Sequence, residues 1–162
     1  IIHFTQLCLI SRGRILIFAD QKNCMQLTTE QVRLIRETWE VLRGVNPYLV
    51  ADVFYRRLFM EHPGLRRLFP DEMDQQYVKL MNMLNVLVER LDQLDDLADD
   101  IADLGRRHVH YGVKPEYYNA VARALLWTLE QALEDSWSRE AEQAWTDCYL
   151  QLAGQMQAGM LH

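Results

Sequence analysis

The 162-residue sequence has few residues that cross-link or break a chain, with three cysteines, four prolines and seven glycines. The cysteines, Cys8, Cys24 and Cys148, are odd in number and follow no metal-binding or redox spacing. This usage indicates unreactive thiols in a reducing compartment, and we therefore expect a cytoplasmic protein. The sequence also lacks any apolar run of the roughly 18 residues that a membrane-spanning helix needs, so no membrane partner is predicted.

The sequence also has no excess of basic residues. The formal net charge is −6, and this balance argues against a nucleic-acid partner. The pairs Arg66-Arg67 and Arg106-Arg107 are too short for basic tails, and we interpret both as solvated helix faces. Hydrophobic residues make up 49% and charged residues 25%, which is typical of a soluble globular protein whose length suits one domain.

Residues 1–24 differ in charge from the rest of the chain. Three basic residues, Arg12, Arg14 and Lys22, stand against one acidic residue, Asp20, which gives +2 and leaves −8 for residues 25–162. The apolar segments of this stretch are interrupted by polar residues, unlike those of a signal peptide. We interpret residues 1–24 as a poorly ordered N-terminal appendage and residues 25–162 as the domain; a folded role for the appendage is the alternative.

From Met25 onward the apolar residues recur with helical periodicity, which predicts an all-α domain of about seven helices with a very short third helix. Prolines stand only at predicted helix starts or breaks. One long helix is expected to face the core with a stripe of apolar residues that begins at Tyr77 and ends at Leu91. Another helix is expected to run from about Asp95 to Tyr111. The predicted starts are the capping box Thr28–Gln31, Asn46-Pro47, His62-Pro63, Pro115 and Ser138.

One histidine lies on the apolar face of a predicted helix. Leu97, Ile101, Leu104, His108 and Tyr111 follow one another at steps of four, three, four and three residues, the stripe that a helix turns toward a core. His110 instead shares its side with Asp103 and Arg107 and is expected to face water. Gly112 then supplies a left-handed helix cap. On this pattern alone, His108 is either a hydrogen-bonded core histidine or a ligand.

Five motifs in this order resemble the globin family, and specifically the bacterial single-domain haemoglobins and the globin domain of flavohaemoglobins. The resemblance covers about residues 26–158. The motifs are Phe54-Tyr-Arg-Arg-Leu-Phe59, His62-Pro63 followed by Phe69, Gln76 four residues before Leu80, Leu104-Gly-Arg-Arg-His108, and Tyr111-Gly-Val-Lys-Pro115.

The resemblance implies a globin fold that holds haem b in a pocket between the distal and proximal helices. His108 would ligate the iron through Nε2, while its Nδ1–H would bond the carbonyl of Leu104 one turn earlier. Because the sequence contains no Cys-x-x-Cys-His motif, the haem is expected to be non-covalent. The implied cofactor-binding set is His108, Phe69, Leu80, Tyr55, Gln76, Val113 and Tyr118, in which Phe69 stacks on the porphyrin and Leu80 and Val113 are haem walls or plain core.

Two polar residues interrupt the apolar faces on the distal side. Tyr55 and Gln76 would donate hydrogen bonds to iron-bound dioxygen, a good acceptor; the alternative is that both are merely solvated. Because the distal residue is glutamine, coordination by a second histidine, as in neuroglobin-like members, is not expected.

The sequence departs from the flavohaemoglobin pattern in two respects. It ends at His162 without the flavin and nicotinamide module, so we expect any reduction to come from a separate reductase. Tyr118 fits the place of the family's proximal tyrosine, whereas Met160 stands where the family has a glutamate. A methionine would leave the proximal histidine more neutral, which weakens the case for dioxygenase chemistry.

The first functional hypothesis is a haem globin that binds dioxygen reversibly, for delivery, buffering or protection. The second is a nitric oxide dioxygenase, which would make the protein an enzyme dependent on a separate reductase. A gas sensor is a third hypothesis, and no transmitter domain accompanies it. We expect dioxygen and other diatomic gases as ligands and a monomer or weak dimer.

Overall fold

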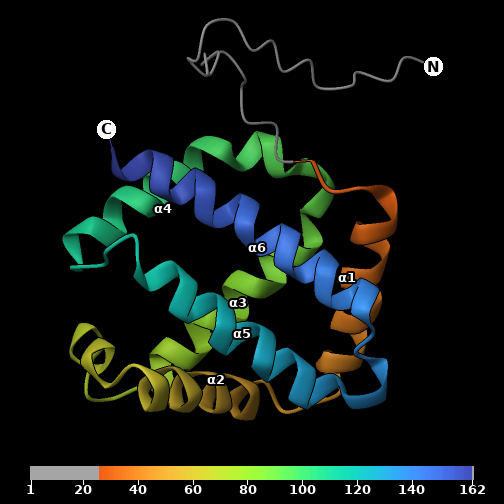
Figure 1. Ribbon diagram of the computed structural model, residues 1–162, viewed down its shortest axis with the longest axis horizontal. Coiled ribbons are helices and arrows are strands. Elements are labelled where there is room, and N and C mark those ends of the chain that lie inside the picture. The colour runs from red at the N-terminus through yellow and green to blue at the C-terminus, as the bar shows by residue number, and fades with distance from the viewer. Residues whose placement is uncertain (1–25, 162) are drawn as a thin grey trace, which may run out of the picture.

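The computed structural model describes residues 26–161, and the predicted appendage at 1–24 lies outside them. Within this range the chain is helical, without strands (Figure 1). The elements are α1 Thr29–Arg43, α2 Pro47–Glu61, the 3₁₀ helix η1 Pro63–Leu68, α3 Asp74–Glu89, the 3₁₀ segment η2 Leu91–Leu97, α4 Ala98–His110, α5 Tyr117–Leu133, the 3₁₀ turn η3 Glu134–Ser136 and α6 Arg139–Met160. The all-α prediction with a short third element, η1, is confirmed.

Local capping signals account for several helix starts. Thr28 accepts a hydrogen bond from the Gln31 N–H at 3.2 Å, and the Gln31 side chain accepts one from the Thr28 N–H at 2.9 Å. Asn46 caps α2 ahead of Pro47, and the Ser138 hydroxyl accepts from the Ala141 N–H at 3.1 Å. These caps satisfy backbone donors that a helix leaves free, which is why these starts were predictable.

The core forms where α1, α5 and α6 pack together and α2 and α3 cover them. Trp39 and Trp145 lie with ring centroids 6.0 Å apart. Each indole N–H has a partner: Trp145 donates to the Thr38 hydroxyl at 3.0 Å and Trp39 to the Asn85 amide oxygen at 2.9 Å. Both indole N–H groups are therefore paired, as burial requires. No helix among residues 26–161 is long and apolar enough to cross a membrane.

Three predicted boundaries were wrong. The long helix ends at Glu89, so Leu91 belongs to η2, and α4 begins at Ala98 rather than near Asp95. A non-helical backbone at Gln93 separates the two helices. Pro115 was also predicted to begin a helix. It lies instead in a turn, where its carbonyl accepts a hydrogen bond from the Tyr118 N–H, and α5 begins two residues later. Apolar periodicity continues through both breaks and therefore cannot mark them.

Helices α4 and α6 approach closely through two glycines (Figure 1). A side-chain carbon on Gly105 of α4 would collide with the backbone of Met156, and one on Gly159 of α6 would collide with the backbone of Ala102. The contact is reciprocal, since each helix contributes one glycine against the other's backbone. This crossing fixes the position of α4, the helix that carries His108.

Candidate functional site

Tyr55 and Gln76 meet between α2 and α3. The Gln76 amide donates a hydrogen bond to the Tyr55 hydroxyl oxygen at 3.0 Å, and Tyr55 is 4% exposed. Burial raises the pKa of Tyr55, although the Gln76 bond opposes the shift, so the phenol stays protonated. Among the described residues the hydroxyl proton has no acceptor. Tyr55 is therefore a donor that is held in place but still free to bond a ligand.

Phe69 lies beside this pair, in the loop that follows η1. Its ring centroid is 5.4 Å from that of Tyr55 and 5.3 Å from that of Phe59, both edge-to-face. The side chain is half-buried, which leaves part of the ring available to a ligand. Leu80 follows Gln76 by one turn of α3 and is also half-buried against the core.

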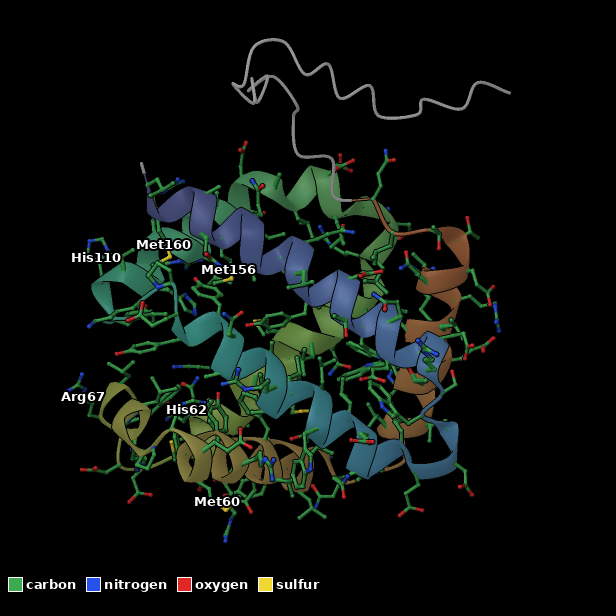
Figure 2. All side chains as sticks on the ribbon, in the orientation of Figure 1. Met60, His62, Arg67, His110, Met156 and Met160 are labelled. Atoms are coloured by element: carbon green, nitrogen blue, oxygen red, sulfur yellow. The ribbon has the colours of Figure 1, made fainter. Side chains whose placement is uncertain are left out.

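Arg66 holds the loop that carries Phe69. Its guanidinium donates to the carbonyls of Phe69 at 3.1 Å, Pro70 at 2.9 Å and Asp71 at 3.1 Å. It also lies 5.5 Å from the centre of the Phe59 ring. The prediction that Arg66 is a solvated helix residue was thus wrong, because three loop carbonyls need a donor there. Arg67 is exposed and projects outward from η1, as predicted (Figure 2).

His108 lies near the end of α4. Its Nδ1 is 2.8 Å from the carbonyl oxygen of Leu104. A carbonyl can only accept, so Nδ1 carries the proton and Nε2 keeps a free lone pair. His110 makes the same bond to Arg106 at 2.9 Å, but His110 is exposed whereas His108 is half-buried. The two histidines therefore differ in burial, as predicted, and not in their backbone hydrogen bond.

Tyr111 departs from the predicted stripe because it is 61% exposed. It is the C-cap residue of α4, where the helix ends, and the left-handed Gly112 follows it. Gly112 has a φ of 82°, and the N–H of Val113 bonds the carbonyl of His108 at 3.0 Å, a left-handed glycine cap as predicted. Val113 is half-buried and tied directly to the backbone of His108.

Tyr118 and Met160 meet next to the α4–α6 crossing. The Tyr118 hydroxyl donates to the Met160 sulfur at 3.7 Å. Met160 lies at the end of α6 beside α4 (Figure 2). Burial raises the pKa of Tyr118, which is 7% exposed. A thioether is a weak acceptor and carries no charge. Met160, which the resemblance aligns with the family's glutamate, thus lies beside Tyr118 but supplies no carboxylate.

The site residues form two groups on different helices. Tyr55 contacts both Gln76 and Phe69, while His108 and the Tyr118–Met160 pair lie around α4. No hydrogen bond or ring contact joins the two groups within residues 26–161. The segments that carry the two groups approach each other at Leu68 and Gly112. A side-chain carbon added to Gly112 would lie 3.4 Å from the Leu68 side chain.

A sequence model of the Globin family matches residues 52–156. A flavohemoprotein of Vibrio cholerae is 29% identical over 130 residues, covering 78% of this chain and 33% of the relative. An uncharacterized globin-like protein of Aquifex aeolicus is 32% identical over 123 residues, covering 76% and 86% of the two chains. The chain belongs to the globin family, and it spans about a third of the length of that flavohemoprotein.

The fold agrees with the solved structure of a bacterial globin from Campylobacter jejuni, which superposes with a TM-score of 0.71 at 21% identity and covers 83% of this chain and 96% of that one. The structure of an engineered carbene transferase, made from a suspected nitric oxide dioxygenase of Rhodothermus marinus, superposes with a TM-score of 0.72 at 23% identity. The alignment covers 84% of this chain and 94% of that one. The globin fold predicted from the five motifs is therefore confirmed.

The donor set fits the family's haem. His108 offers one lone pair, and Tyr55 and Gln76 offer hydrogen-bond donors rather than a second strong ligand. The role of Arg66, the two glycines of the α4–α6 crossing, and the contacts of Tyr48 and Tyr77 were not predicted from the sequence. Glycines inside predicted helices were the available signal for the crossing. Nothing in the sequence indicated the carbonyls that Arg66 binds.

Proposed function

We propose that this protein is a haem b globin that binds dioxygen reversibly, for delivery, buffering or protection. The observation that carries the proposal is the Gln76-to-Tyr55 hydrogen bond of 3.0 Å. It uses a lone pair of the phenol and leaves the phenolic proton for a ligand. A hydrogen bond to a partly anionic acceptor in an apolar site is strong, which suits bound dioxygen.

The roles of the other residues follow from their positions. Haem, when bound, supplies the iron that carries the gas. His108 would hold the iron through Nε2, oriented by the bond from Nδ1 to Leu104. Phe69 would stack on the porphyrin, Leu80 and Val113 would line it, and Tyr118 would support the proximal side. Because Gln76 is not a histidine, we expect no second histidine to hold the iron on the distal side.

Nitric oxide dioxygenation is the second candidate. The similarity to the Vibrio cholerae flavohemoprotein and to the Rhodothermus marinus structure favours it. The Tyr118–Met160 contact weighs against efficient turnover, because methionine cannot draw charge onto the proximal histidine. The oxygenated protein would then consume nitric oxide once and stop in the ferric state, with continuous nitrate production only when a separate reductase is added. A slow or absent reaction with nitric oxide would favour dioxygen storage or gas sensing as the function.

We further propose that the protein works in the cytoplasm as a monomer or weak dimer. Dioxygen and related diatomic gases are its proposed ligands, and the similarity to a flavohemoprotein favours a reductase as its partner.

The proposal is tested by haem retention in two matched variants. His108→Ala should abolish stable haem binding, because among residues 26–161 it removes the one half-buried imidazole whose Nε2 has no partner. His110→Ala is the control, since His110 makes the same backbone contact but is exposed. The absorption spectrum of each purified, reduced protein, alone and under dioxygen and carbon monoxide, is the measurement. Equal haem content in the two variants would contradict the ligand assignment.

A further inference from the structure

Three tyrosines form a continuous row from the distal site to the surface. Tyr55 and Tyr77 are stacked, with centroids 5.6 Å apart and an interplanar angle of 18°. Tyr77 meets Tyr48 edge-to-face at 4.9 Å. Exposure rises along the row, since Tyr55 is 4% exposed, Tyr77 is half-buried and Tyr48 is 46% exposed.

The two outer tyrosines each have a carboxylate at the hydroxyl. Tyr77 donates to Asp52 at 2.8 Å, and Tyr48 donates to Asp74. Arg56 bonds the second oxygen of Asp52 at 2.8 Å. Burial disfavours the ionised Asp52, but the bonds from Arg56 and Tyr77 outweigh it and lower the pKa of Asp52. Asp52 is therefore a carboxylate at neutral pH, ready to accept a proton from Tyr77.

Phenols are among the side chains that give up one electron most readily, and an oxidised phenol is a strong acid. A row of touching phenols needs a base at each site if a charge is to move along it. The structure supplies such bases at Tyr77 and Tyr48, and neither is needed to pack the core. Packing alone would be served equally well by phenylalanine.

We propose that Tyr55, Tyr77 and Tyr48 form a relay that carries single oxidising equivalents out of the distal pocket to a small reductant in solvent. The relay rests on the proposed haem function, and its oxidant is hydrogen peroxide that enters the pocket in place of dioxygen. It would protect the pocket from oxidative damage.

Each step of the relay balances. Tyr55 gives one electron and its hydroxyl proton to the oxygen being reduced, and regains an electron from Tyr77 and a proton from solvent. Tyr77 passes its proton to Asp52, and recovers it when Tyr48 supplies the next electron. Tyr48 lends its proton to Asp74 until a one-electron reductant such as ascorbate reduces it. Two passages convert one hydrogen peroxide and two protons to two waters.

The test uses the haem-loaded protein mixed with hydrogen peroxide. Freeze-quench electron paramagnetic resonance detects a tyrosyl radical, and mass spectrometry locates dityrosine cross-links between molecules. The wild-type protein should form a radical and cross-links at Tyr48, and ascorbate should suppress both. Tyr48→Phe should lose them. Tyr77→Phe should also lose them, although Tyr48 remains exposed, because the relay is interrupted.

Two further variants make the result specific. Asp52→Asn keeps an acceptor for the Tyr77 hydroxyl but removes the base, and it should also lose the radical at Tyr48. Tyr111→Phe is the matched control: Tyr111 is 61% exposed and its ring lies 6.0 Å from that of His108, so it is the competing outlet. This variant should react as the wild type does.

Cross-linking through Tyr48 that persists in Tyr77→Phe, or that is lost in Tyr111→Phe, would overturn the relay. The absorption spectrum recorded before peroxide is added separates the two proposals. A protein that retains haem but forms no radical at Tyr48 contradicts the relay alone. A protein that retains no haem contradicts both the relay and the proposed function.

Discussion

At the scale of single residues, the direction of one hydrogen bond decides what the distal site can offer. An amide nitrogen cannot accept, so Gln76 must donate to the Tyr55 oxygen at 3.0 Å. The phenolic proton is thereby left for a ligand in the pocket. A glutamine that merely faced solvent would leave the rotation of the tyrosine hydroxyl unrestrained. The pair is therefore a preorganised donor rather than two separate polar residues.

Tyr55→Phe should accelerate dioxygen dissociation. A hydrogen bond to a partly anionic acceptor contributes roughly 1.5–3 kcal/mol, which corresponds to about ten- to a hundredfold in the dissociation rate. Carbon monoxide should respond much less, because its oxygen carries little charge. Stopped-flow and flash-photolysis rates for both gases are the measurement. An unchanged dioxygen rate would show that Tyr55 does not face the ligand.

Gln76→Leu provides the companion experiment. It should act in the same direction as Tyr55→Phe but more weakly, because the phenol remains and loses only the group that orients it. Equal effects of the two substitutions would mean that Gln76 itself bonds the ligand.

At the scale of elements, the α4–α6 crossing controls where His108 lies. Both close approaches are glycine against backbone, so no side-chain rotation can relieve an added methyl group. Any residue larger than glycine at either point must push the two helices apart. The histidine at the end of α4 then moves with its helix.

Gly159→Ala should destabilise the protein and disturb the haem. Overpacking of this kind costs typically 1–3 kcal/mol, and the shift of α4 should also speed haem loss. Gly154→Ala is the control on the same helix, where an added methyl group meets nothing within 4 Å. It should stabilise α6 by about 0.5–1 kcal/mol, because glycine is a poor helix former. Urea unfolding and the rate of haem transfer to apomyoglobin measure the two effects, and equal responses would contradict the crossing.

The elements also show what the sequence could predict. Helix starts at Thr28, Asn46 and Ser138 were predictable because their caps are local, as was the cap at Gly112. The break at Gln93 was not predictable, since apolar residues continue on both sides of it.

The site divides in the same way. The Nδ1 bond of His108 spans one turn of its own helix, and it follows from the ligand role that the resemblance implies for this residue. Arg66 was misjudged because its partners are loop carbonyls, whose positions depend on the tertiary fold. Tyr111 is exposed although helical periodicity predicts that it faces the core, because it is the cap residue at which α4 ends.

At the scale of the whole molecule, the ionisable groups buried in the described core are neutral at physiological pH. They are the thiol of Cys148 and the phenols of Tyr55 and Tyr118, while the buried polar side chains are threonines. Burial raises the pKa of Cys148 from 9.0 to about 12. Burial and the bond to Asp52 raise the pKa of Tyr77 from 10.0 to about 12. These buried groups are therefore harder to deprotonate in the folded protein than in the unfolded chain.

Stability should accordingly fall in alkali. The unfolded thiol ionises near pH 9 whereas the folded one remains protonated, so its stabilising contribution is full below pH 9 and is lost as the pH rises toward about 12. Urea unfolding at a series of alkaline pH values should give a declining free energy of unfolding. Cys148→Ala should make the decline shallower above pH 9, and an unaltered slope would rule out the buried thiol as a cause.

The α4–α6 crossing also has a consequence for how the molecule is made. Residues 98–110 leave the ribosome well before residues 139–160, yet α4 packs mainly on α6. Until α6 has emerged, Gly105 lacks the backbone of Met156 against which it packs, and the nascent chain cannot hold α4 and His108 in place. Cofactor capture would therefore wait for α6. A ribosome that stalls before Gly159 would carry a chain in which α4 has not yet reached its final position.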